Sequence, residues 1–131
     1  MAHPIPDWTD AADLQFNLAR ASAAAMANVY LEAGFAVAID DNIPPHKADR
    51  MLAPLEKWAP QRVLLVPPVE KCLERNETRT GKNFDKELLA EAIRWMYPAI
   101  LEGHADADTY LRVDNSDLTL DQVADRILSS S

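Results

Sequence analysis

The sequence predicts a single α/β domain over residues 1–131, built on a parallel sheet. Three short apolar runs, at residues 35–40, 61–66 and 109–113, have the length and composition of strands buried on both faces. Helical periodicity fills the stretches between them, and strands that alternate with helices form parallel sheets with helical crossovers. The expected order of elements is α-β-α-β-α-α-β-α.

The first helix is expected to begin near Asp13 and to end before Gly34, because glycine commonly follows the last turn of a helix. Its apolar residues recur four, three, four and four positions apart, which is the spacing of one helix face. They are Leu14, Leu18, Ala21, Ala25 and Val29. The run Phe-Ala-Val-Ala-Ile-Asp at 35–40 follows directly and predicts the first strand.

The middle of the chain is divided by prolines. Residues 46–58 predict a short helix that Pro54 disturbs, since proline lacks the backbone N–H that a helix needs. The second strand, at 61–66, stops at Pro67 and Pro68.

The C-terminal half predicts three more helices and the third strand. Helices are expected over residues 69–76 and 84–101, before the strand at 109–113. Thr119 and Gln122 stand three residues apart at the start of the last helix, which is the spacing of a capping box.

The overall composition excludes several classes of function. Hydrophobic residues make up 48% of the chain and charged residues 26%, as in ordinary globular proteins. The net charge of −8 leaves no basic stripe, so we expect no nucleic-acid partner. No apolar stretch is long enough for a bilayer, so we expect no membrane partner. The single cysteine, Cys72, cannot form an internal disulfide and favours a reducing cytoplasm.

Polar residues follow each predicted strand. Asp40 and Asp41 end the first strand, and Asp114 and Asn115 follow the third. Because ligands bind at the carboxyl ends of parallel strands, we expect these residues to share one rim. A carboxylate there can hold Mg²⁺ beside a phosphate or act as a general base. The alternative is that Asp40 or Asp41 caps the following turn, and the motif alone favours that alternative.

Three cations gather within eight residues of this acidic chain, at Arg75, Arg79 and Lys82. On a helix, Arg75 and Arg79 would project from the same side, and the planar guanidinium group can clamp phosphate oxygens. The alternative is a set of solvated ion pairs with nearby acidic residues. The position directly after a strand favours the phosphate-binding interpretation.

Two stretches of the sequence resemble a known family. Residues 30–41, Tyr-Leu-Glu-Ala-Gly-Phe-Ala-Val-Ala-Ile-Asp-Asp, are similar to the "helix, glycine, strand, aspartate" segment of small P-loop kinases. Residues 63–68, Val-Leu-Leu-Val-Pro-Pro, followed by Leu-Glu-Arg-Asn-Glu-Thr-Arg at 73–79, resemble their fourth strand and arginine-bearing lid. This group includes adenylate kinase, gluconate kinase, chloramphenicol phosphotransferase and the zeta toxins. The resemblance runs from about Trp8 to Leu128 and implies a three-layer sheet of P-loop NTPase type.

The resemblance also implies a chemistry, namely phosphoryl transfer from ATP with Mg²⁺ to a small-molecule hydroxyl. Asp40 would lie near the metal ion or the acceptor, and Arg75 and Arg79 would neutralise the transferring phosphate. Four further residues would lie beside the cofactor. They are Asp41, Lys82, Asp114 and Asn115.

One essential part of such kinases is missing. The chain has three glycines, and its sole Gly-Lys pair, Gly81-Lys82, has no glycine five residues earlier and no following Ser or Thr. No loop of backbone N–H groups would therefore cradle the phosphates. We expect no appreciable kinase turnover, because positioning and electrostatics supply nearly all of the catalysis in phosphoryl transfer.

Several interpretations follow from the missing loop. The chain is a fragment or truncated form of a kinase, completed by the absent segment. Alternatively, it is an evolved remnant that acts as a non-enzymatic interaction module and forms a homodimer, or binds a partner, through an exposed sheet edge. A third interpretation is an unrelated α/β binding domain with Arg75 and Arg79 in surface ion pairs.

Overall fold

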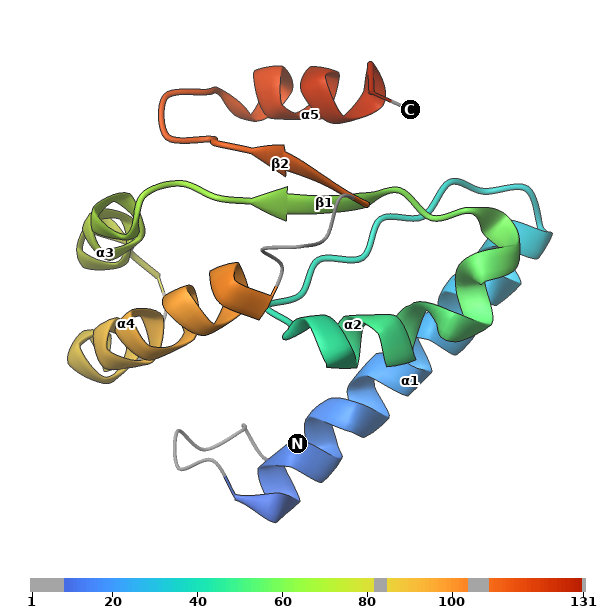
Figure 1. Cartoon of the computed structure of the whole chain (residues 1–131), viewed down its shortest axis with the longest axis horizontal. Coiled ribbons are helices and arrows are strands. Elements are labelled where there is room, and N and C mark those ends of the chain that lie inside the picture. The colour runs from blue at the N-terminus through green and yellow to red at the C-terminus, as the bar shows by residue number, and fades with distance from the viewer. Residues whose placement is uncertain (1–8, 82–84, 104–108, 131) are drawn as a thin grey trace. The chain divides into compact units, whose positions relative to one another are not determined.

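The computed structural model describes residues 9–81, 85–103 and 109–130. The chain forms two compact units, residues 1–60 and 61–131. Helices make up most of the secondary structure in the described ranges (Figure 1).

The N-terminal unit begins with helix α1 (Asp10–Glu32), and both ends of this helix are capped. The Thr9 hydroxyl accepts a hydrogen bond from the backbone N–H of Ala12 at 3.2 Å. At the other end, Gly34 adopts φ +87° and donates to the carbonyl of Leu31 at 3.0 Å. The stop signal predicted at Gly34 is therefore confirmed.

Helix α1 packs through alanines rather than through its larger apolar side chains. Ala12, Ala24 and Ala27 are buried. Leu14 and Val29, on the face with the predicted apolar spacing, are 59% and 64% exposed. The small alanine face lets neighbouring helices approach closely. The second apolar face of α1 stays uncovered by the described residues of the N-terminal unit.

Two short elements cover the alanine face of α1. They are α2 (Pro45–Leu52) and the 3₁₀ helix η1 (Ala53–Trp58). Ala24 and Ala27 of α1 form one buried cluster with Met51 of α2 and Leu55 of η1. The predicted disturbance at Pro54 is the change from α-helix to the tighter 3₁₀ form.

The predicted strand at residues 35–40 is wrong. The structure gives these residues no strand, and all six are exposed. They belong to a non-helical connection between α1 and α2 (Figure 1). An apolar run becomes a strand only when another strand supplies its hydrogen bonds, and none pairs with it in the described ranges.

The C-terminal unit contains the sheet, which has two strands in the described part of the chain. β1 (Arg62–Leu65) and β2 (Tyr110–Val113) run parallel, with Arg62 opposite Tyr110 and Leu65 opposite Val113. The strands predicted at 61–66 and 109–113 thus pair with each other, and the described residues contain no third strand. The three-layer sheet of P-loop NTPase type is contradicted, because two short strands in a mostly helical chain cannot build it.

Three helices complete the C-terminal unit. α3 (Val69–Thr78) packs against α4 (Lys86–Gly103), and α5 (Leu120–Leu128) follows β2. The predicted capping box at α5 is confirmed, since the Thr119 hydroxyl and the Gln122 side chain each bond the backbone of the other residue. None of the helices in the described ranges has the length and apolar character needed to cross a membrane.

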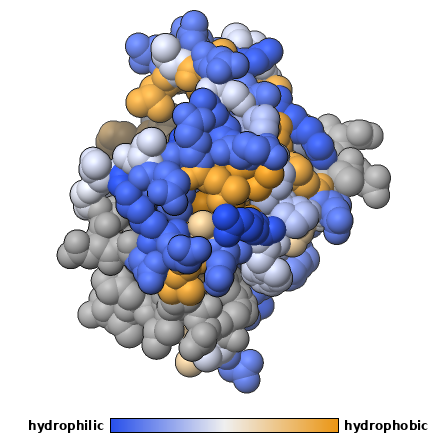
Figure 2. All heavy atoms as spheres, turned by 90° about the vertical axis from the view of Figure 1, so that its left-hand side faces the viewer, coloured by the Kyte–Doolittle hydropathy of each residue, from blue (hydrophilic) through white to orange (hydrophobic). Residues whose placement is uncertain are grey.

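Several large apolar side chains of the C-terminal unit are exposed. Leu65 of β1, Leu88 of α4 and Leu120 of α5 are all exposed. Figure 2 shows the side on which α3 and α4 lie in Figure 1, and hydrophobic patches there are separated by hydrophilic residues.

Candidate functional site at the carboxyl ends of the strands

The two strands end at the same edge of the sheet. The parallel register places Leu65 beside Val113. The N–H of Val66 donates to the carbonyl of Val113 at 2.9 Å, so the pairing continues one residue beyond β1. The chain then turns into Pro67 after β1 and Asp114 after β2. Of the residues predicted to share this edge, Asp114 and Asn115 follow a strand, whereas Asp40 and Asp41 do not.

The turn after β2 is organised by Asp114. Its Oδ1 accepts hydrogen bonds from the backbone N–H of Ser116, at 2.9 Å, and from the Ser116 hydroxyl. These bonds, led by that of the hydroxyl, hold the pKa of Asp114 below its usual value. The positive charge of Arg75 adds to the same effect. Asp114 is therefore a stable carboxylate at neutral pH.

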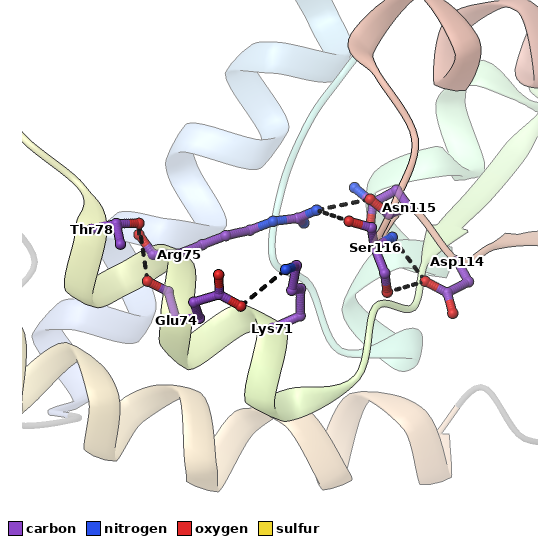
Figure 3. Close-up of polar contacts among 7 residues, drawn as sticks. All are labelled: Lys71, Glu74, Arg75, Thr78, Asp114, Asn115 and Ser116. Carbon is purple, nitrogen blue, oxygen red and sulfur yellow. Dashed lines mark hydrogen bonds and ion pairs between the residues drawn. The ribbon is translucent and has the colours of Figure 1, made fainter.

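Arg75 joins α3 to this turn. Its Nη2 donates to the carbonyl of Asn115 at 2.8 Å and to that of Ser116 at 3.4 Å (Figure 3). The structure therefore brings three of the predicted site residues together, namely Arg75, Asp114 and Asn115. Arg75 acts here as a clamp on the backbone, and its guanidinium group has further N–H donors on Nε and Nη1.

Arg79 lies in a different environment from Arg75. Helix α3 ends at Thr78, and Arg79 has the extended angles φ −65° and ψ 129°. Its side chain makes no hydrogen bond or ion pair within the part of the chain that the structure describes. Arg79 therefore lies just beyond the helix that carries Arg75, and the four-residue spacing does not place the two side chains on one helix face. Lys82 lies outside the described residues.

Two groups of α3 and α4 have pKa values that burial raises, and one of them, Tyr97, was not singled out from sequence. The Tyr97 hydroxyl on α4 donates to the carbonyl of Pro67 at 2.8 Å, and burial raises the pKa of Tyr97. Burial likewise raises the pKa of the Cys72 thiol on α3. No local signal marks Tyr97.

The other predicted acids, Asp40 and Asp41, belong to the N-terminal unit. Asp41 Oδ2 accepts a hydrogen bond from Arg20 Nε at 2.6 Å, and Arg20 is only 7% exposed. The Arg20 guanidinium also lies over the ring of Phe16, with 5.3 Å from Cζ to the ring centroid. Asp40 is exposed and makes no hydrogen bond or ion pair in the described ranges.

The described residues do not form a metal site. No three His, Cys, Asp or Glu side chains among them gather closely enough to hold a metal ion. Mg²⁺ needs several oxygen ligands in near-octahedral geometry, and the carboxylate of Asp41 is already bound to Arg20. We therefore derive no chemistry through Mg²⁺ or ATP from this arrangement.

Comparison with known proteins adds no relative. No protein-family model matches the chain, and no curated protein or solved structure matches it either. The resemblance to small P-loop kinases rests on the sequence segments quoted above and stays a prediction.

Proposed function

We propose that this chain is a non-enzymatic interaction module that binds another protein chain through exposed apolar residues of its N-terminal unit. These residues, named here the apolar surface, lie on α1 and on the connection that follows it. They are Leu14, Leu18, Met26, Val29, Tyr30, Phe35, Val37 and Ile39.

The observation that carries this proposal is the position of the larger side chains on α1. Leu14, Leu18 and Val29 are between 58% and 64% exposed, whereas the buried positions of the helix are taken mainly by alanines. A soluble monomer rarely leaves such residues in a contiguous group, because each loses about 1.5–3 kcal/mol of burial free energy. A row of them along a helix is typical of a surface that another chain covers.

The test compares a charged surface variant with a core variant. We expect the wild-type chain to associate as its concentration rises in sedimentation velocity, and the double variant Leu14→Glu/Leu18→Glu to stay monomeric. At a concentration where both chains are monomeric, the double variant should unfold at nearly the wild-type urea concentration, since both side chains are exposed. Leu55→Ala, in the buried cluster, should lose about 2–5 kcal/mol of stability. A double variant as unstable as Leu55→Ala would show that the surface is part of the core and would overturn the proposal.

A second candidate function is a phosphate-binding role inherited from a phosphotransferase of the cytoplasm. It is favoured by the cluster of Arg75, Asp114 and Asn115 at the carboxyl ends of parallel strands, where ligands of α/β proteins bind. The substrate would be a small-molecule phosphate acceptor, and turnover would need the missing loop. A rise in melting temperature with ATP and Mg²⁺ that Arg75→Met removes would support this role. If ATP and Mg²⁺ do not raise the melting temperature, the interaction module is the better explanation.

A further inference from the structure

We propose that the partner is a second copy of this chain, and that residues 35–39 of the two copies pair as antiparallel strands centred on Val37. This inference rests on the proposed function and narrows it to one partner and one contact.

The connection from 35 to 39 has side chains and backbone groups suited to strand pairing. Phe35, Val37 and Ile39 are 62%, 39% and 37% exposed. Residues 36–42 make no backbone–backbone hydrogen bond within the part of the chain that the structure describes. Their N–H and C=O groups are therefore available to another strand, and main-chain pairing is a common way to bind an extended segment.

The sequence of this segment is symmetric in side-chain size. Reading Phe-Ala-Val-Ala-Ile in either direction gives large, small, large, small, large. In an antiparallel pair centred on Val37, Phe35 of each copy faces Ile39 of the other, and the two Val37 residues face each other. All the large side chains then lie on one face of the pair and all the alanines on the other. A self-complementary segment of this kind fits the two-fold symmetry of most homodimers.

The same register avoids direct repulsion between charges. Asp40 of one copy would lie opposite Gly34 of the other, and Asp41 opposite Ala33, so no two carboxylates face each other across the pair. Each chain nevertheless carries a net charge of −8. The two copies therefore repel at long range, and association should strengthen as salt screens this repulsion.

The start of the segment is fixed by α1. The N–H of Phe35 donates to the carbonyl of Tyr30 at 3.0 Å. The rings of the two residues meet edge to face with 5.8 Å between their centroids. Ordering before association reduces the conformational entropy that is lost on binding. The start of the segment is thus already ordered before a partner strand binds.

The register is tested by single cysteines in a Cys72→Ser background, oxidised under native conditions. Val37→Cys should cross-link with itself, because residues directly opposite have Cβ atoms about 4.5–5.5 Å apart, close to disulfide geometry. Phe35→Cys alone and Ile39→Cys alone should not cross-link, since like positions are about 13 Å apart in this register. A mixture of the Phe35→Cys and Ile39→Cys chains should cross-link as Val37→Cys does.

A second variant tests the contact without cysteine chemistry. Val37→Lys should weaken association about tenfold or more in sedimentation, and it should leave the urea midpoint unchanged at a concentration where both chains are monomeric. Asn42→Lys adds the same charge outside the paired residues, so it serves as the matched control. Both substitutions lower the net negative charge by the same amount, so any change in long-range repulsion is the same in the two variants. We therefore expect only Val37→Lys, which lies within the paired residues, to weaken association.

Each alternative outcome overturns the inference. Association of the wild type without cross-linking of Val37→Cys would exclude this register and leave the proposed function standing. Equal cross-linking of Phe35→Cys alone and Val37→Cys would indicate random collision. A wild type that remains monomeric at high salt and high concentration would exclude a second copy as the partner. A double variant Leu14→Glu/Leu18→Glu as unstable as Leu55→Ala would separately overturn the proposed function.

Discussion

Arg20 on α1 holds Asp41 through a hydrogen bond and ion pair of 2.6 Å between Nε and Oδ2. The two residues are 21 positions apart, so the pair ties the connection after α1 back onto the helix. Together with the contact between Tyr30 and Phe35, it anchors residues 35–41 at both ends. The segment proposed to pair with a second copy is therefore held in place although its own backbone makes few hydrogen bonds.

Removing Asp41 should destabilise the N-terminal unit. Asp41→Ala leaves the Arg20 guanidinium without its partner at a position that is 7% exposed. An unpaired charge in such a place is costly, and we expect a loss of about 2–3 kcal/mol in urea unfolding. Asp40→Ala is the matched control, because Asp40 is exposed, and it should change stability by less than about 0.5 kcal/mol. Equal effects of the two substitutions would mean that the ion pair contributes nothing.

Gly34 should be the least replaceable residue at the end of α1. Its φ of +87° lies in the left-handed region, which strains any residue with a Cβ atom, although nothing lies within 4 Å of that position. Gly34→Ala should therefore lose about 1 kcal/mol in urea unfolding, through backbone strain alone. Gly34→Asn should lose less, because asparagine tolerates this conformation better. An alanine variant as stable as the wild type would contradict the observed cap.

The features that sequence predicted correctly depend on neighbouring residues. The stop at Gly34, the break at Pro54 and the capping box of Thr119 and Gln122 each arise from a few adjacent side chains and backbone groups. The contact of Arg75 with the carbonyl of Asn115 was not predicted, because the sequence argument placed Arg75 beside Asp40 and Asp41.

The features that sequence could not predict depend on distant partners. The run at 35–40 has the composition of a buried strand, but a strand needs a neighbour that composition does not reveal. On α1 both faces are apolar, so periodicity identified one face without showing that the alanine face packs. The ion pair of Arg20 and Asp41 joins a helix to a distant loop, and no local pattern marks it. The prediction of a three-stranded sheet was wrong for the same reason, since pairing partners are not visible in composition.

Arg75 and Arg79 should differ although they are four residues apart. Arg75→Met removes the hydrogen bonds to the carbonyls of Asn115 and Ser116. We expect a loss of about 1 kcal/mol in stability and faster amide exchange in the turn after β2. Arg79→Met should leave both measurements unchanged, because Arg79 has no partner among the described residues. If Arg79→Met also loosened the turn, the clamp assigned to Arg75 alone would be wrong.

Asp114 should make the stability of the C-terminal unit depend on pH at the acid end. Its pKa lies below the ordinary value of 3.8 in the folded chain, because the Ser116 hydroxyl and N–H bond the charged carboxylate. The unfolded chain takes up the proton first as pH falls. The stabilisation by Asp114 is therefore complete above the unfolded pKa and is lost as pH falls through the folded pKa.

Urea unfolding of the wild type and Asp114→Ala over a range of pH isolates this contribution from that of other carboxylates. Asp13 and Glu32 also have lowered pKa values, through bonds to Lys47 and Lys57, but they are present in both chains and cancel in the difference. The wild type should be more stable at pH 7, and the difference should shrink below about pH 4. Ser116→Ala should bring the pKa of Asp114, followed by NMR titration, back toward its usual value. A difference that stays constant down to acid pH would show that the Ser116 bonds do not favour the charged form of Asp114.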